Sequence, residues 1–63
     1  MKNNIHKYRR AAGLTQKELS RVSGACIPTH LSDIEKGKKI PSVYTALKIS
    51  KALGATVEDL FNE

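Results

Sequence analysis

The sequence predicts an all-α protein, a compact five-helix bundle in a single domain that spans residues 1–63. Two observations support this fold class. Glycines and prolines divide the chain into five short segments, and within each segment the apolar residues recur three and four positions apart, as on one face of a helix. No segment alternates apolar and polar residues beside a hairpin turn, which argues against strands. At this length the chain has no room for a second hydrophobic core.

The first segment predicts a helix from about Asn4 to Ala12. Ile5, Tyr8 and Ala12 are spaced to lie on one face of this helix, which we expect to face the core. Asn3 or Asn4 can cap its start, because a short polar side chain accepts a hydrogen bond from a free backbone N–H group. The glycine that follows can end the helix in the left-handed conformation.

The second segment has the clearest start signal. Thr15 is followed three residues later by Glu18, which is the spacing of a capping box. Leu14 and Leu19 are placed to pack against each other across this start, as in a hydrophobic staple. Leu19 and Val22 are expected to face the core, and the next glycine is expected to end the helix.

The third segment predicts a helix over about residues 28–36 that begins at Pro28, because the missing N–H group costs nothing at the first helical position. Leu31 and Ile34 form its expected buried pair. The fourth helix is expected to start at a capping Ser42. Its inner face is predicted at Val43, Ala46, Leu47, Ser50 and Leu53.

The fifth segment is short, and Thr56 with Asp59 repeats the capping pattern at its start. Val57, Leu60 and Phe61 have two interpretations. They either belong to the core, where they would pack on the first and fourth helices, or they form the surface of a dimer.

The formal net charge is +5, and its distribution is uneven. Residues 1–10 carry four basic and no acidic side chains, residues 36–51 carry five lysines and no acid, and residues 52–63 carry three acids and no base. Two basic segments are typical of a surface that binds a polyanion, although an ordinary solvated surface would fit the same charges. No apolar run is long enough for a transmembrane helix, and no stretch combines a strong amphipathic face with Trp or Phe anchors, so no membrane partner is expected.

Catalysis, metal binding and cofactor binding are not expected from the side chains present. Cys26 is the single cysteine, which excludes an internal disulfide and a Cys-pair zinc site, and we expect it to fill the turn as a small apolar residue. His6 and His30 lack a metal-binding spacing. With Glu18 assigned to a cap, no nucleophile, base and acid remain to form a catalytic set. We therefore expect a binding protein of a reduced compartment rather than an enzyme.

The second and third helices, joined by a short turn with a glycine, are typical of a helix-turn-helix motif, whose second helix fits the DNA major groove. Three stretches carry a closer likeness: GLTQKEL at 13–19, LSDIEKG at 31–37, and an ungapped stretch over 41–61. Together they resemble the Cro and phage-repressor type of helix-turn-helix domain (XRE-like), which has the lambda-repressor-like DNA-binding fold.

This resemblance implies a sequence-specific regulator of transcription that binds double-stranded DNA as a homodimer on a palindromic operator, in the cytoplasm of a prokaryotic or phage-infected cell. Such a regulator would repress or activate by occupying the operator, and repression is the favoured alternative. The resemblance places base contacts at the first exposed positions of the third helix, Pro28, Thr29, Ser32 and Asp33. It places contacts to the DNA backbone at Gln16, Lys36, Lys38, Lys39 and Ser42. Lys17 is also expected to contact the backbone. The resemblance also implies a partly buried structural ion pair between Arg9 and Glu35. Tyr44, beside the cap of the fourth helix, either donates to a phosphate or lies on the surface.

The chain departs from the family pattern in two ways. It has one extra residue between Gly24 and Glu35, which we place in the turn at 25–27, so that Ile27 takes the usual polar N-cap position. The alternative buries Ile27 in the turn and starts the third helix later. The third helix also offers bases no Arg, Gln or Asn, and Thr29 and Ser32 discriminate weakly, so the basic segments and DNA shape are expected to contribute specificity.

Two other functions fit the same fold. The exposed face of the third helix could bind a protein, which would make the chain a protein-interaction module. The chain could also be an antitoxin or a phage accessory protein that binds both DNA and a protein partner.

Overall fold

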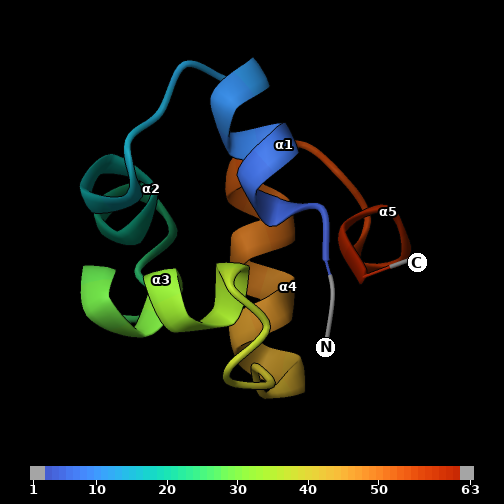
Figure 1. The fold of residues 1–63 in the computed structure, drawn as a ribbon. Coiled ribbons are helices and arrows are strands. Elements are labelled where there is room, and N and C mark those ends of the chain that lie inside the picture. The colour runs from blue at the N-terminus through green and yellow to red at the C-terminus, as the bar shows by residue number, and fades with distance from the viewer. Residues whose placement is uncertain (1–2, 62–63) are drawn as a thin grey trace.

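Residues 3–61 are described in the computed structural model of the chain, and within this range they form helices joined by short loops. The helices are α1 (Ile5–Ala11), α2 (Gln16–Ser23), α3 (Pro28–Glu35), α4 (Val43–Leu53) and α5 (Val57–Phe61). The longest, α4, stands in the middle of Figure 1, with α2 and α3 on one side and α5 on the other. The all-α, five-helix prediction is therefore confirmed for residues 3–61. No helix in this range is long and apolar enough to cross a membrane.

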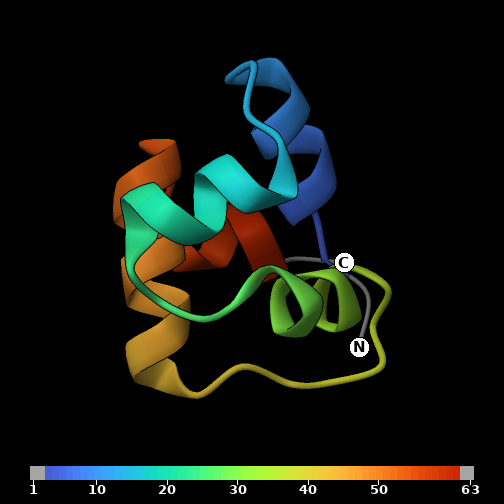
Figure 2. The same ribbon diagram turned by 90° about the vertical axis from the view of Figure 1, so that its left-hand side faces the viewer.

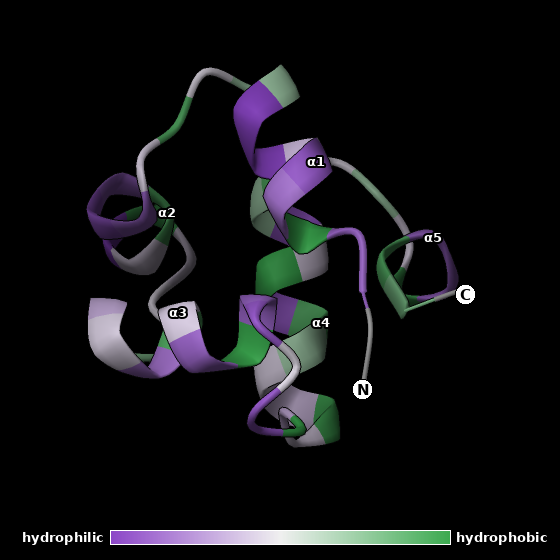
Figure 3. Cartoon of the chain, viewed as in Figure 1, coloured by the Kyte–Doolittle hydropathy of each residue, from purple (hydrophilic) through white to green (hydrophobic). Residues whose placement is uncertain are grey.

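One core holds the bundle together, and every helix contributes to it. Six large apolar side chains are completely buried in this core: Ile5, Leu19, Leu31, Ile34, Ile49 and Leu60. In Figure 3 the hydrophobic colour concentrates on α4 and on the parts of α1 and α3 beside it, whereas most of α1 is hydrophilic. Burial of Leu60 assigns this residue of α5 to the core, where α5 contacts α1 and α4.

Side-chain caps start three of the helices as the sequence predicts. At α2 the Thr15 Oγ accepts from the Glu18 N–H group at 3.1 Å, and the Glu18 Oε1 accepts from the Thr15 N–H group at 3.0 Å. At α4 the Ser42 Oγ accepts from the N–H group of Thr45 at 3.1 Å. A second capping box, formed by Thr56 and Asp59, precedes α5.

The turn between α2 and α3 decides where the third helix begins. Gly24 ends α2 with φ of +62°, a left-handed conformation that costs glycine little and other residues more. Ile27 is extended (φ −76°, ψ 158°) and is the N-cap of α3, and Pro28 follows as the first helical residue. Ile27 is 67% exposed, which excludes the alternative in which Ile27 is buried in the turn. Beneath the turn, the hydroxyl of Ser20 donates to the carbonyl oxygen of Cys26.

The inner faces of two helices differ from the prediction. Leu19 is completely buried as predicted, but Val22 is 55% exposed, and the polar Ser20 takes the second buried position on α2 instead. On α4, Val43 and Leu47 are 78% and 44% exposed, while Ile49, which was not predicted to face inward, is completely buried. The buried residues of α4 are Ala46, Ile49 and Ser50.

The prediction that α4 faces inward from its first residue is wrong. In Figure 1 the first turn of α4 extends beyond α3, and Val43 at its start is exposed. In α1 the observed helix is one residue shorter at each end, and Ala12 is exposed rather than facing the core. Asn4 is the N-cap of α1 by position, but the Ile5 N–H group donates to the side chain of Asn3, at 3.1 Å.

Candidate nucleic-acid interface

Helices α2 and α3 share one face of the molecule. In Figure 2, which turns that face to the viewer, α2 lies above α3 and the loop from α3 to α4 passes below. The residues predicted to contact bases are all on α3. Pro28 and Thr29 are exposed at its first turn, whereas Ser32 and Asp33 are half-buried further along. The accessible end of α3 is therefore its N-terminal turn.

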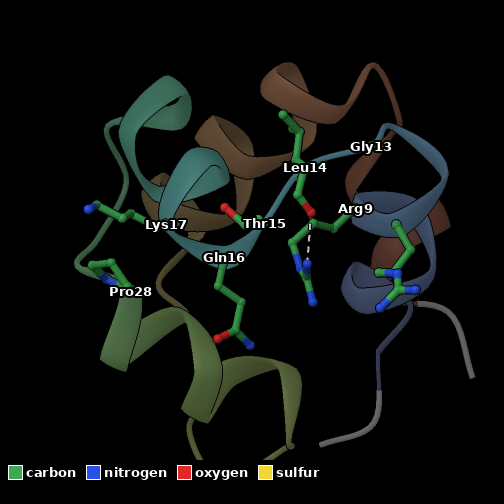
Figure 4. Close-up of a pocket in the computed structure, with 8 residues that line it drawn as sticks. Arg9, Gly13, Leu14, Thr15, Gln16, Lys17 and Pro28 are labelled. Carbon is green, nitrogen blue, oxygen red and sulfur yellow. Dashed lines mark hydrogen bonds between the residues drawn. The ribbon is translucent and has the colours of Figure 1, made fainter.

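A hollow of about 670 Å³ lies between the end of α1, the start of α2 and the start of α3. Figure 4 shows Lys17 and Pro28 on one side of it, Arg9 on the other, and Gln16 between them. The hollow brings together predicted base and backbone contacts from two helices with the loop that precedes α2. Its lining residues are Arg9, Arg10, Gly13, Leu14, Thr15, Gln16, Lys17 and Pro28.

Beneath this hollow, α1 is joined to α3 by a buried ion pair. Nε of Arg9 donates to Oε2 of Glu35 at 2.9 Å, and the two side chains are only 8% and 4% exposed. Nη1 of Arg9 also donates to the carbonyl oxygen of Leu14 at 2.8 Å, which ties down the loop before α2. The ion pair expected between Arg9 and Glu35 is thus present in the structure.

The same carboxylate orients a predicted DNA-contacting side chain. Nε2 of Gln16 donates to Oε1 of Glu35 at 3.3 Å, and Nη2 of Arg9 donates to Oε1 at 3.2 Å. Nδ1 of His6 lies 3.4 Å from that oxygen and 3.0 Å from Nη2 of Arg9. Glu35 therefore connects side chains from α1 and α2 at the C-terminal end of α3.

The loop after α3 presents its lysines close to that helix. Lys36, Lys38 and Lys39 are all exposed. The backbone N–H groups of Lys38 and Lys39 donate to the carbonyl oxygen of Asp33 at 2.9 and 3.3 Å, so the loop folds back on the last turn of α3. Nζ of Lys39 lies 3.9 Å from Oδ2 of Asp33, which reduces the repulsion between this carboxylate and an approaching anion.

At the start of α4, the polar groups already have partners within the chain. The hydroxyl of Ser42 caps α4 and donates to Oγ1 of Thr45 at 3.0 Å. Tyr44 is 68% exposed, and Nζ of Lys48 lies 4.5 Å from the centre of its ring. Nζ of Lys48 also donates to the carbonyl oxygen of Gly24 at 3.4 Å, so Lys48 is not simply solvated as its place in a basic segment suggests.

Two side chains near this face have shifted pKa values. The backbone N–H group and the hydroxyl of Thr15 hydrogen-bond the Glu18 carboxylate, and this lowers the pKa of Glu18 below its usual range. Burial raises the pKa of the Cys26 thiol, which favours the neutral form and fits a packing role in the turn. Among residues 3–61, His, Cys, Asp and Glu form no group of three that could hold a metal ion.

Sequence reasoning missed one basic residue of the hollow. Arg10 is exposed and lines the same hollow as Lys17, although from the sequence it counted only toward the charge of the N-terminal segment. The signal was its position at the end of α1, one short loop before the start of α2. Lys2, another basic residue of that segment, lies outside the described residues.

A family model described as helix-turn-helix matches residues 5–60, which is nearly the whole chain. The chain belongs to the XRE-type helix-turn-helix family. The HTH-type transcriptional regulator MJ0272 of Methanocaldococcus jannaschii is 43% identical over 61 residues, which cover 97% of this chain and 91% of that protein. The HTH-type transcriptional regulator YgzD of Bacillus subtilis is 39% identical over 97% of this chain and 91% of its own length.

A solved structure agrees with this helix-turn-helix assignment. The restriction-modification controller protein C.AhdI from Aeromonas hydrophila superposes with a TM-score of 0.85 and is 29% identical. The match covers 92% of this chain and 86% of that chain. Both the fold and the family predicted from the three sequence stretches are therefore confirmed.

Proposed function

We propose that this helix-turn-helix protein is a sequence-specific, double-stranded DNA-binding regulator of transcription that places α3 in the major groove. The observation that carries the proposal is the exposure of the first turn of α3 between two sets of basic side chains. Lys17 and Arg10 line the same hollow as Pro28 at the start of α3, and the lysines of the following loop lie beside the end of this helix. A groove about 12 Å wide accepts one helix, and flanking cations match the phosphates on either side.

The hollow suits one phosphate group of the DNA backbone. Lys17 and Arg10 supply positive charge, and the first backbone N–H groups of α2 point out of the helix start, where anions bind well. Gln16 has two amide hydrogens, and its bond to Glu35 fixes one of them and leaves the other for a phosphate oxygen. Because the charge of Arg9 is matched by Glu35, we assign Arg9 a structural role.

The remaining backbone contacts are proposed for the other side of α3, at Lys36, Lys38, Lys39, Ser42 and Tyr44. The lysines supply most of this attraction, because the hydroxyl of Ser42 is already engaged in the cap of α4. Tyr44 is exposed and is held beside Lys48, which suits a hydroxyl that donates to phosphate. Pro28, Thr29, Ser32 and Asp33 are proposed to face the bases, with Thr29 and Ser32 contacting them.

Regulation would follow from occupancy of the operator, which we propose to be repression by a homodimer in the cytoplasm, without any catalytic step. A dimer would bind a palindrome with half-sites roughly 34 Å apart. The exposed apolar side chains Val43 and Leu47, one turn apart on α4, support a contact with a second copy better than the buried Leu60 does. Analytical ultracentrifugation with and without DNA measures the oligomeric state.

Selection of bound sites from a pool of random duplexes tests the proposal. We expect one enriched motif with twofold symmetry, and its half-site spacing reports the dimer. If each monomer neutralises about 4–6 phosphates, the logarithm of affinity falls with the logarithm of salt concentration at a slope of about −0.9 per contact. A pool that shows no enrichment, together with no salt-dependent binding at low ionic strength, would overturn the proposal in favour of a protein-interaction module. Co-purification of a second chain alongside DNA binding would instead indicate an antitoxin or accessory protein.

A further inference from the structure

Ile27 is an unusual residue for its place at the start of α3. As the N-cap of this helix it makes no side-chain hydrogen bond, although N-caps are normally Ser, Thr, Asp or Asn. Its side chain is also 67% exposed, so it adds little to the core. Neither helix capping nor core packing explains a large apolar side chain at this position. Contact with a ligand is the remaining role for it.

The surroundings of Ile27 place it on the proposed DNA-binding face. Pro28, the next residue, lines the hollow together with Gln16 and Lys17, where we place a phosphate of the DNA backbone. Figure 4 shows Pro28 and Lys17 on the same side of that hollow. In helix-turn-helix proteins the N-terminal residues of the recognition helix approach the base edges, so Ile27 stands where bases would lie.

The chemistry of this turn selects the kind of base edge that it can recognise. The exposed side chains there are Ile27, Pro28 and Thr29, which present methyl and methylene groups and no guanidinium or amide. In the major groove, the C5 methyl group of thymine is the apolar feature of a base pair, and apolar side chains contact it. 5-Methylcytosine carries a methyl group at the same ring position.

We propose that Ile27 is a specificity-determining residue that contacts the C5 methyl group of a pyrimidine in the major groove. This inference rests on the proposed DNA-binding function and adds a recognised group to it. A protein partner fits the same surface less well, because the polar Thr29 lies two positions after Ile27 and the cationic Lys17 lines the hollow beside Pro28.

The test replaces single methyl groups in a duplex obtained from the random-site selection. Each thymine in turn is replaced by uracil, which lacks only the C5 methyl group, and each cytosine by 5-methylcytosine. We expect one position per half-site at which uracil weakens binding about fourfold, as the loss of one buried methyl group predicts. A matching gain on 5-methylcytosine, with cytosine placed at that position, would show recognition of the methyl group in either base. If the methyl group strengthens binding in thymine relative to uracil but not in 5-methylcytosine relative to cytosine, the contact is assigned to an A·T pair. Both results support the proposal.

The variant Ile27→Ser links this effect to the residue. Serine is a preferred N-cap, so the variant keeps the start of α3, and we expect it to bind the thymine and uracil duplexes equally. Ile40→Ser is the matched control, because Ile40 is 73% exposed in the loop after α3, and it should keep the fourfold ratio.

The possible failures are distinguishable. If the unmodified protein selects no DNA motif, the proposed function fails. If it selects a motif but every uracil duplex binds like its thymine counterpart, or if Ile27→Ser keeps the fourfold ratio, the methyl contact is overturned while the DNA-binding function stands.

Discussion

The two ends of α3 differ in almost every physical respect. At the C-terminal end, Glu35 is 4% exposed and bonds to side chains from α1 and α2. At the N-terminal end, Ile27, Pro28 and Thr29 are exposed, and the cap residue makes no side-chain bond. One end of the helix is thus fixed by a closed polar network, while the other is open to a ligand.

Residues that stabilise the fold and residues proposed to recognise DNA thus lie at opposite ends of one short helix. A buried charge must keep its partners, so the C-terminal end tolerates few substitutions. Exposed positions contribute little to stability, so the N-terminal end can change its contacts with DNA while the fold remains intact. Both ends can be tested in the same assays of unfolding and DNA binding.

The largest effect is expected for Glu35→Ala. It leaves the guanidinium of Arg9 buried without its carboxylate, which typically costs about 3–5 kcal/mol. In a domain of this size that loss is comparable with the whole stability, and urea unfolding monitored by circular dichroism should show a protein that is largely unfolded. Glu58→Ala, on the exposed first turn of α5, is the matched control and should unfold like the unmodified chain.

Replacing both charged partners with apolar residues of similar size separates charge loss from lost packing. Arg9→Met combined with Glu35→Leu should be clearly more stable than Glu35→Ala alone, because no buried charge is left unpaired. Equal stability of the two proteins would show that the ion pair is not what fixes this end of α3.

A smaller effect is expected at the capping box of α2, a polar network that is exposed rather than buried. Thr15→Ala removes the acceptor for the Glu18 N–H group and should destabilise the fold by about 1 kcal/mol in urea unfolding. Thr15→Ser keeps that acceptor and serves as the control. A loss as large as that for Glu35→Ala would contradict the comparison between exposed and buried networks.

At the open end of α3, Thr29→Ala should leave the unfolding free energy within about 0.5 kcal/mol of the original. Selection from random duplexes should then show a relaxed preference at one base position, with unchanged affinity for non-specific DNA. An unchanged preference would remove Thr29 from the residues proposed to contact bases.

Lys39→Ala tests the phosphate contacts beside the same helix. It should weaken binding to all sequences alike and reduce the magnitude of the salt slope by about 0.9, measured by fluorescence anisotropy over a salt series. Lys51→Ala removes an exposed lysine from the last turn of α4 and should keep the slope. Equal slopes for Lys39→Ala and the unmodified protein would exclude Lys39 from the interface.

The smallest effect concerns pH. Because the pKa of Glu18 is lowered in the folded protein, its contribution to stability is present at neutral pH and is lost as the pH falls through that lowered pKa. Glu18→Gln should therefore flatten the acid side of the stability curve slightly, as measured by thermal unfolding between neutral and acidic pH. An unchanged acid limb would show that the carboxylate does not stabilise the cap.

The elements set by local chemistry were predictable from the sequence. The capping box at Thr15 and Glu18 and the start of α3 at Pro28 involve neighbours in the chain, and the structure contains both. The inner faces of α2 and α4 could not be predicted in this way, because the exposure of Val22 and Val43 depends on where the other helices lie.

The site shows the same division. The exposure of Thr29 and the loop lysines followed from the motif, and the ion pair of Arg9 with Glu35 followed from the family resemblance. The bond between Gln16 and Glu35 joins residues 19 positions apart, and the hollow with Arg10 forms only when three segments meet. No local sequence pattern predicts contacts between segments that are so far apart in the chain. Ile27 could be placed at the N-cap of α3 because the short turn allows few other positions for it.

The N–H group of Asn4 donates to the carbonyl oxygen of Leu60 at 2.6 Å, and its side-chain amide donates to the carbonyl oxygen of Asp59 at 3.0 Å. These two hydrogen bonds hold the beginning of the described chain against its end at α5. In Figure 1, α5 lies on the opposite side of α4 from α2. A fluorophore or an immobilisation tag attached to α5 would lie across α4 from α2, and we expect such a label to leave Ile27 unobstructed.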